Sequence, residues 1–179
     1  MRYFIQYFIP GLYPGLFVVF FWAAASLSGA EGAAATETHF DLSGTVRVTK
    51  ISDGDSVRSG SLRIRLFGID APEIKQQCQD QNGADWTCGI AARNKLQDLV
   101  STSPYLTCNL RDVDRYGRLV MQCFAGATDI GAAMVEAGYA LAYRRYAEDY
   151  HSQEQQAQKS RRGIWKGAFM PPWDWRKAN

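Results

Sequence analysis

The stretch RIRLFGIDAPE, which runs from Arg63 to Glu73, decides how the fold of this sequence is interpreted. Apolar side chains recur there at every second position, which predicts a strand with one buried face. The residues of that face are Leu62, Ile64 and Leu66. The opposite face presents Arg65, and the strand passes through Gly68 to two carboxylates, Asp70 and Glu73. The end of this strand either carries ordinary surface charges or forms part of a functional site.

The segments around this stretch predict a small β-barrel. Strands are expected over residues 44–51, 56–58 and 62–69, with the turn SDGD and the loop SGS between them. Alternating residues predict two more strands over 105–110 and 118–125, joined by a turn that contains DRYG. Five short strands in this order, with a helix between the third and the fourth, are typical of an OB-type barrel. We therefore predict an α+β fold.

Three helices are expected to cover the barrel. The first covers residues 86–100 and has an apolar stripe of Ala92, Leu96 and Leu99. The second begins at Thr128 or Asp129, either of which can cap it, and ends at Gly138. The third is a polar helix over residues 147–162.

The N-terminal segment differs from the rest of the chain because Arg2 is its only charge before Glu31. It contains the apolar run LFVVFFWAAASL and then small residues, a pattern typical of a signal peptide over residues 1–30. The run is short for a membrane span, which needs roughly 20 residues. The uncharged stretch is longer, however, so an uncleaved inner-membrane anchor over about residues 12–30 stays the alternative.

Either interpretation of the leader predicts an exported protein, periplasmic or secreted. The small, polar residues 31–42 are expected to be a linker. The folded domain is expected over residues 43–167, and residues 168–179 are expected to be a C-terminal tail. Contact with a membrane is expected only if the leader is retained.

Four cysteines lie in the predicted domain, which agrees with export to an oxidising compartment. They are Cys78, Cys88, Cys108 and Cys123. Four cysteines allow three pairings, and buried free thiols are a further alternative. A zinc site is disfavoured because the sequence has no CxxC pair. Local pairing within a loop and across a hairpin is the best prediction, giving Cys78–Cys88 and Cys108–Cys123.

The overall charge does not by itself indicate a nucleic-acid-binding protein, because the formal net charge is only +2. Residues 144–177 are locally basic, with eight Lys or Arg against four Asp or Glu. A solvated helix and a binding surface for a polyanion explain this surplus equally well.

Two carboxylates from different strands are expected to meet at the predicted site. In a β-meander the start of the second strand lies beside the end of the third, so Asp55 and Asp70 can approach each other. Two adjacent carboxylates repel unless a cation neutralises them, and oxygen ligands without nearby His or Cys suit Ca²⁺ or Mg²⁺.

Two arginines and a third carboxylate complete the predicted set. Arg65 and Arg118 would neutralise a phosphate, and Glu73 would handle the attacking water. Taken alone, the segments that carry Asp55 and Asp70 are better explained as a turn and a solvated strand end, and the one that carries Arg118 can be a polar hairpin tip. Together they predict phosphoryl-transfer chemistry.

The segments SDGDS, RIRLFGIDAPE and DRYGR resemble, in order and spacing, the signature segments of staphylococcal-type thermonucleases. The resemblance covers residues 43–166, where AYRRYAEDY and SRRGIW are similar to the closing segments of that family. It implies a five-stranded OB-type β-barrel with three α-helices. It also implies a Ca²⁺-dependent endonuclease of the micrococcal nuclease type, which hydrolyses DNA and RNA at the 5′-oxygen–phosphorus bond and leaves 3′-phosphates.

The resemblance also implies roles for individual residues. Asp55 and Asp70 would be carboxylate ligands of the metal, and Ala71 would supply a backbone carbonyl. Arg65 and Arg118 would hold the scissile phosphate, and Glu73 would orient or deprotonate water. The residues expected to bind the rest of the substrate are Arg115, Tyr116, Tyr143 and Tyr146.

The resemblance has departures that bear on substrate preference. The hairpin between Asp55 and Arg65 is shorter than in the staphylococcal enzyme, and the loop after Glu73 carries two additional cysteines. The expected substrates are DNA and RNA, single-stranded or locally unpaired, with a monomeric protein and no protein partner implied. The alternative is a non-catalytic OB-fold nucleic-acid-binding module, possible because fold alone does not determine function.

Overall fold

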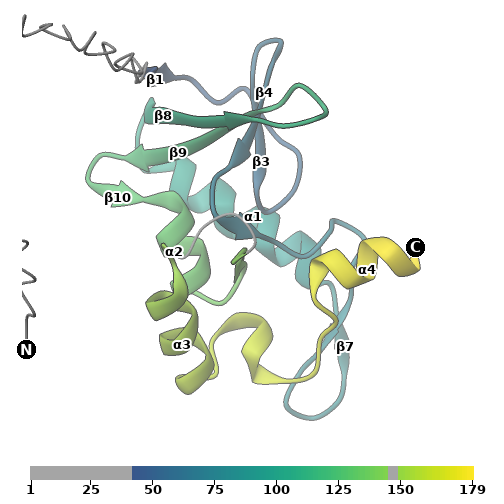
Figure 1. Ribbon diagram of the computed structural model, residues 1–179. Coiled ribbons are helices and arrows are strands. Elements are labelled where there is room, and N and C mark those ends of the chain that lie inside the picture. The colour runs from purple at the N-terminus through teal and green to yellow at the C-terminus, as the bar shows by residue number, and fades with distance from the viewer. Residues whose placement is uncertain (1–41, 145–148) are drawn as a thin grey trace, which may run out of the picture. The chain divides into compact units, whose positions relative to one another are not determined.

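The computed structural model describes residues 42–144 and 149–179 (Figure 1). The strands are β1 (Ser43–Val46), β2 (Lys50–Ile51), β3 (Ser56–Ser59), β4 (Leu62–Leu66), β5 (Ile69–Asp70), β6 (Cys78–Gln79), β7 (Asp85–Trp86), β8 (Leu106–Val113), β9 (Leu119–Ala125), β10 (Thr128–Asp129) and β11 (Leu141–Ala142). The helices are α1 (Cys88–Ser101), α2 (Ile130–Glu136), α3 (His151–Lys159), the 3-10 helix η1 (Gly163–Lys166) and α4 (Pro172–Ala178). The predicted leader and most of the linker lie outside the described residues.

The main sheet is mixed and curled, in the order β1-β8-β9-β4-β3-β2, with β10 added beside β9. All of its pairs are antiparallel except β4 with β9, which are parallel and align Ile64 with Leu119. Helices α1, α2 and α3 gather below the sheet in the view of Figure 1. The α+β fold of OB type that the sequence predicts is therefore confirmed, with α4 as a fourth α-helix.

The core lies between the curled sheet and the helices. Ile64 and Leu66 of β4 are buried, and so are Ala92 and Leu96 of α1, as their spacing predicts. The prediction for Leu62 was wrong, since this residue is 50% exposed. It lies next to the two-residue turn of the β3–β4 hairpin. Within the described residues, no helix has the length and apolar character needed to span a bilayer.

The strands differ from the prediction where the chain bends. The first predicted strand is interrupted at residues 47–49, which separate β1 from β2. These two strands lie at opposite ends of the main sheet, so the chain must turn between them. The polar loop of residues 74–85 also contains structure, because β6 in its middle pairs with β7 at its C-terminal end.

The four cysteines form the two local pairs that the sequence predicts. The Cys78–Cys88 bond joins the β6–β7 hairpin to the start of α1, and the Cys108–Cys123 bond joins β8 to β9. No described cysteine is free. The second bond joins residues that lie opposite each other in the ladder, so it fixes the hairpin that carries DRYG.

The C-terminal residues pack onto the domain, although the sequence analysis treats residues 168–179 as a tail. Cys78, Cys88, Leu141 and Ile164 form a second, smaller core. The side chains packed against it are Trp86, Trp165, Phe169 and Trp173. Pro172 starts α4 at a position where its missing N–H costs no helical hydrogen bond. Phe169 and Trp173, which the sequence analysis assigns to a tail, therefore anchor α4 to the domain.

Candidate functional site

Asp55 is placed by a close approach of backbone segments. A Cβ atom at Gly54 would lie 2.6 Å from the Ala71 Cβ and 2.8 Å from the Ala92 Cβ, so only glycine fits there without a shift. The Leu66 amide donates to the Asp55 carbonyl oxygen at 2.8 Å. The SDGD turn therefore brings Asp55 against both the end of β4 and helix α1.

The structure brings Asp55 and Asp70 together, as the hairpin argument predicts. Both carboxylates are buried, with exposures of 2% and 0%, and both pair with one guanidinium. Arg65 contacts the Asp55 carboxylate through Nη1 and donates from Nη2 to Asp70 Oδ1 at 2.6 Å. The second Asp55 oxygen accepts a hydrogen bond from the Ala71 amide at 2.8 Å. These contacts form one cluster from three segments of the chain.

Burial dominates the electrostatics of this cluster. It raises the pKa of Asp55 to about 6, although the positive charge of Arg65 opposes the shift. Burial also acts to lower the pKa of Arg65, but Asp55 and Asp70 outweigh it and the net direction is upward. Keeping the Asp55 carboxylate ionised in this buried position therefore costs desolvation free energy. Additional positive charge nearby would favour the ionised form.

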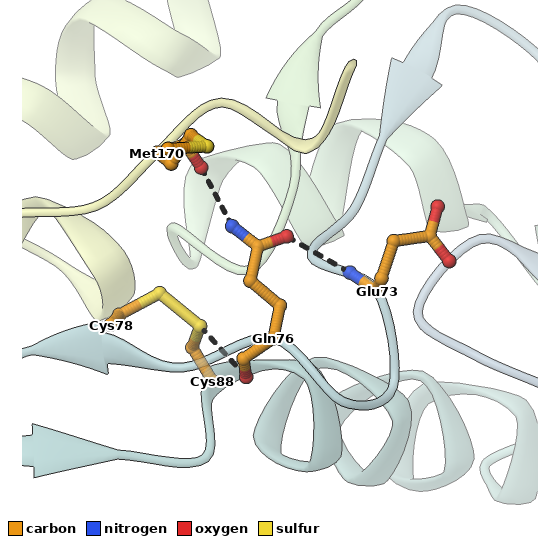
Figure 2. The surroundings of a disulfide bond; sticks show 5 residues. All are labelled: Glu73, Gln76, Cys78, Cys88 and Met170. Carbon is orange, nitrogen blue, oxygen red and sulfur yellow. Dashed lines mark hydrogen bonds between the residues drawn. A yellow bond between two sulfur atoms is a disulfide. The ribbon is translucent and has the colours of Figure 1, made fainter. Parts of the chain in front are cut away.

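Glu73 sits on a loop that Gln76 fixes (Figure 2). Gln76 is fully buried, and its side-chain Oε1 accepts from the backbone N–H of Glu73 at 3.2 Å. The backbone N–H of Gln76 in turn donates to the Glu73 carbonyl oxygen at 2.7 Å. Its Nε2 donates to the Met170 carbonyl oxygen at 2.6 Å. The Glu73 carboxylate points away from the Cys78–Cys88 disulfide in Figure 2 and is only partly buried. The loop is thus rigid while the carboxylate stays accessible.

Arg176 of α4 belongs to the site, and the sequence analysis missed it. Its Nη1 donates to Glu73 Oε1 at 2.7 Å, and both its terminal nitrogens contact Asp70, at 3.0 and 2.7 Å. Hydrogen bonds with Asp70 and Glu73 raise the pKa of the Arg176 guanidinium despite partial burial, which acts to lower it. The only signal in the sequence was a basic residue in an aromatic C-terminal segment, and that does not identify a partner.

Arg118 does not pair with the buried carboxylates. It lies just before β9, which runs beside β4, and its Nε donates to Asp114 Oδ2 at 2.7 Å. Partial burial acts to raise the pKa of Asp114, but hydrogen bonds from Arg118 and Tyr116 lower it overall. The Asp114 carboxylate, on the same hairpin, thus holds the Arg118 guanidinium. This hairpin includes β9, which is the neighbour of the strand that carries Arg65.

The tip of this hairpin combines cations with an exposed aromatic ring. Tyr116 is 56% exposed, and the guanidiniums of Arg115 and Arg118 lie 4.8 and 5.6 Å from its ring centre. Arg115 also donates to the Tyr116 hydroxyl at 2.6 Å. Tyr143 is elsewhere and stacks on Trp173 with a centroid distance of 5.8 Å. Tyr146 lies outside the described residues.

The donor chemistry at the cluster fits a hard divalent cation. Asp55 and Asp70 are buried oxygen donors that share one guanidinium, and the backbone of Ala71 lies against Asp55. Among the described residues, no three His, Cys, Asp or Glu side chains are grouped as a ready-made metal site. A cation would therefore be held by the two carboxylates and a backbone carbonyl such as that of Ala71, and it would have to compete with the arginines.

Fold and site together define an OB-type barrel protein with a carboxylate–arginine cluster at the end of a strand. Residues 63–167 match the family described as staphylococcal nuclease homologue. The chain belongs to this family.

Curated relatives support this membership. A micrococcal nuclease of Shigella flexneri is 33% identical over 150 residues, covering 74% of this chain and 80% of that protein. A protein of Escherichia coli O157:H7 described as an uncharacterized endonuclease is 33% identical over 138 residues, covering 73% and 83%. The succinoglycan biosynthesis protein ExoI of Rhizobium meliloti is 35% identical over 118 residues, or 65% of this chain, which spans only 62% of that relative's length.

Proposed function

We propose that the protein is an exported, Ca²⁺-dependent endonuclease that hydrolyses phosphodiester bonds of DNA and RNA. The observation that carries the proposal is the joining of two buried carboxylates by Arg65, with Glu73 on the adjoining loop. Relatives described as a micrococcal nuclease and an uncharacterized endonuclease match this chain over 80% and 83% of their length. Two disulfides agree with an oxidising compartment, either the periplasm or the exterior.

Each residue of the cluster has a distinct proposed role. Asp55, Asp70 and the Ala71 carbonyl would hold the cation, which supplies positive charge to offset the developing charge on the phosphate. Arg65 and Arg118 would bind the phosphate oxygens in the bidentate manner of guanidiniums. Glu73 would orient the attacking water and accept its proton. Cleavage of the 5′-oxygen–phosphorus bond would leave a 3′-phosphate, as the family resemblance implies.

A row of cations next to the site suggests where the nucleic acid runs. Lys50, Arg58 and Arg63 are direct neighbours across β2, β3 and β4, and all three are exposed. Like charges placed opposite each other destabilise a sheet, so the row costs stability unless a polyanion covers it. No described carboxylate forms an ion pair with Lys50 or Arg58. Arg63 shares its strand face with Arg65, so the row leads to the site.

Replacing Lys50 or Arg58 with Gln is expected to weaken single-stranded DNA binding and to reduce its salt dependence. Each substitution should lower the slope of log K against log salt by about 0.7, the value for one phosphate contact on a single strand. Fluorescence anisotropy without divalent cations measures the slope. Lys159→Gln, an exposed charge on α3, is the matched control. An unchanged slope in both strand variants would contradict this substrate path.

Digestion of plasmid DNA and of RNA, in millimolar Ca²⁺ and again with a chelator, tests the proposed function. Products with 3′-phosphates that disappear on chelation are expected. The rival function is a non-catalytic OB-fold nucleic-acid-binding module, which would bind without cleaving. The rival has no support in the sequence, because no carboxylate or arginine of the expected set is missing.

A further inference from the structure

The Arg176 guanidinium occupies the oxygens that a cation would need. Asp70 Oδ1 accepts from Arg65 at 2.6 Å and from Arg176 at 3.0 Å, and Asp70 Oδ2 accepts from Arg176 at 2.7 Å. Both oxygens of this buried carboxylate therefore contact a guanidinium. The same Arg176 also holds Glu73, so one side chain engages both a proposed metal ligand and the proposed water-handling group.

The C-terminal segment is fixed in a way that delivers Arg176 to this place. The Gln79 amide donates to the Ala168 carbonyl oxygen at 2.7 Å, and Gln76 donates to that of Met170. Trp173, three residues before Arg176, stacks on Tyr143. These contacts anchor α4 independently of the ion pairs. The Arg176 side chain is nevertheless 37% exposed, so it can leave the carboxylates while the helix stays docked.

Arg176 and a divalent cation would occupy the same Asp70 oxygens. Three carboxylates (Asp55, Asp70 and Glu73) form ion pairs with two guanidiniums (Arg65 and Arg176), and the charge of Asp53 also acts on Asp55 and Arg65. A divalent cation added to this arrangement would lie beside a guanidinium bound to the same oxygens. Like charges at such distances repel strongly in a buried site.

We propose that Arg176 is an intramolecular competitor of the divalent cation, which holds Asp70 and Glu73 until a cation displaces its guanidinium. The inference rests on the cation site of the proposed function. It makes Arg176 a positioning residue that lowers cation affinity and keeps Glu73 paired when no cation is bound. Binding of the cation at Asp70 would therefore also release the Glu73 carboxylate to handle the attacking water.

Calorimetric titration with CaCl₂ tests this inference without nucleic acid. The protein is produced from the full chain, oxidised and stripped of metal, as wild type, Arg176→Gln and Lys177→Gln. Lys177 is the matched control because it is the next residue of α4 and, among residues 42–144 and 149–179, pairs only with Asp174 of the same helix. Arg176→Gln should bind Ca²⁺ at least about tenfold more tightly than wild type, a difference of about 1.4 kcal/mol, and the control should match wild type.

Thermal unfolding gives a second measurement of Ca²⁺ binding, and it compares wild type with two variants of Arg176. Ca²⁺ should raise the Tm of Arg176→Gln more than that of wild type, because tighter binding to the folded state gives greater stabilisation. Arg176→Lys keeps the charge with fewer directed donors and should lie between the two.

The possible outcomes separate this inference from the proposed function. Equal or weaker Ca²⁺ binding by Arg176→Gln, with wild-type cleavage still dependent on Ca²⁺, overturns the competition and leaves the function standing. Absence of Ca²⁺ binding in every variant overturns both the competition and the proposed cation site. Tighter binding by Arg176→Gln and by the control alike would show a general charge effect and would also overturn the inference.

Discussion

Replacing Arg65 with Ala is expected to lower kcat for phosphodiester hydrolysis by at least about 10²-fold. Arg65 is the residue that joins Asp55 to Asp70, and its guanidinium is the group proposed to bind the phosphate together with that of Arg118. Arginine contacts in phosphoryl transfer are worth about 10³–10⁵ in rate, so the loss should appear in kcat and in kcat/KM. Initial rates on a defined oligonucleotide at saturating Ca²⁺ measure both quantities.

Arg65→Ala also removes a partner from two buried carboxylates, so reduced stability must be separated from reduced chemistry. Arg118→Ala serves this purpose, because its ion pair is with Asp114 on its own hairpin and the carboxylate cluster stays intact. It should lose a similar factor in kcat with little change in unfolding free energy. Arg162→Ala is the control, since Arg162 pairs with Glu136 away from the site. Wild-type turnover in the Arg65 and Arg118 variants would rule out the proposed roles.

Glu73→Gln is expected to lower kcat by about 10²–10⁴-fold, the usual contribution of a general acid–base group. The substitution is nearly isosteric and keeps an oxygen that can accept from Arg176. The loop should keep its conformation, because Gln76 holds the backbone of residue 73 rather than its side chain. Glutamine cannot accept the proton of the attacking water, so the loss should fall on kcat.

Binding of a single-stranded oligonucleotide in the absence of cleavage separates the role of Glu73 from a role in affinity. Glu73→Gln should bind the oligonucleotide about as tightly as wild type. Gln77→Ala, an exposed change in the same loop, is the matched control and should leave kcat unchanged. A Glu73→Gln enzyme with wild-type kcat would show that another group handles the water.

The sequence predicted the parts of the site that depend on local patterns. Alternation in β4 determined the buried face of Ile64 and Leu66, and the hairpin register brought Asp55 and Asp70 to the same Arg65 guanidinium. These features follow from strand periodicity and turn residues, which can be recognised in a stretch of about 20 residues of sequence.

The parts that could not be predicted depend on contacts between distant segments. Arg176 meets Asp70 across 106 positions of sequence, and no periodicity links them. The burial of Gln76 depends on the Met170 carbonyl, 94 positions away. The prediction for Leu62 was wrong for a different reason: the residue continues the apolar alternation of β4 but lies at the exposed hairpin end of the strand. Residues that act through long-range packing leave no local signature in one sequence.

The parallel pairing of β4 with β9 has a consequence for how the protein acquires activity. The two strands are about 55 residues apart, whereas the β8–β9 hairpin closes locally and contains the Cys108–Cys123 bond. Closing a long loop for non-local strand pairing is slow compared with forming a hairpin. We therefore expect the β8–β9 hairpin to close before β4 pairs with β9, so that the segments carrying Arg65 and Arg118 come side by side late in folding.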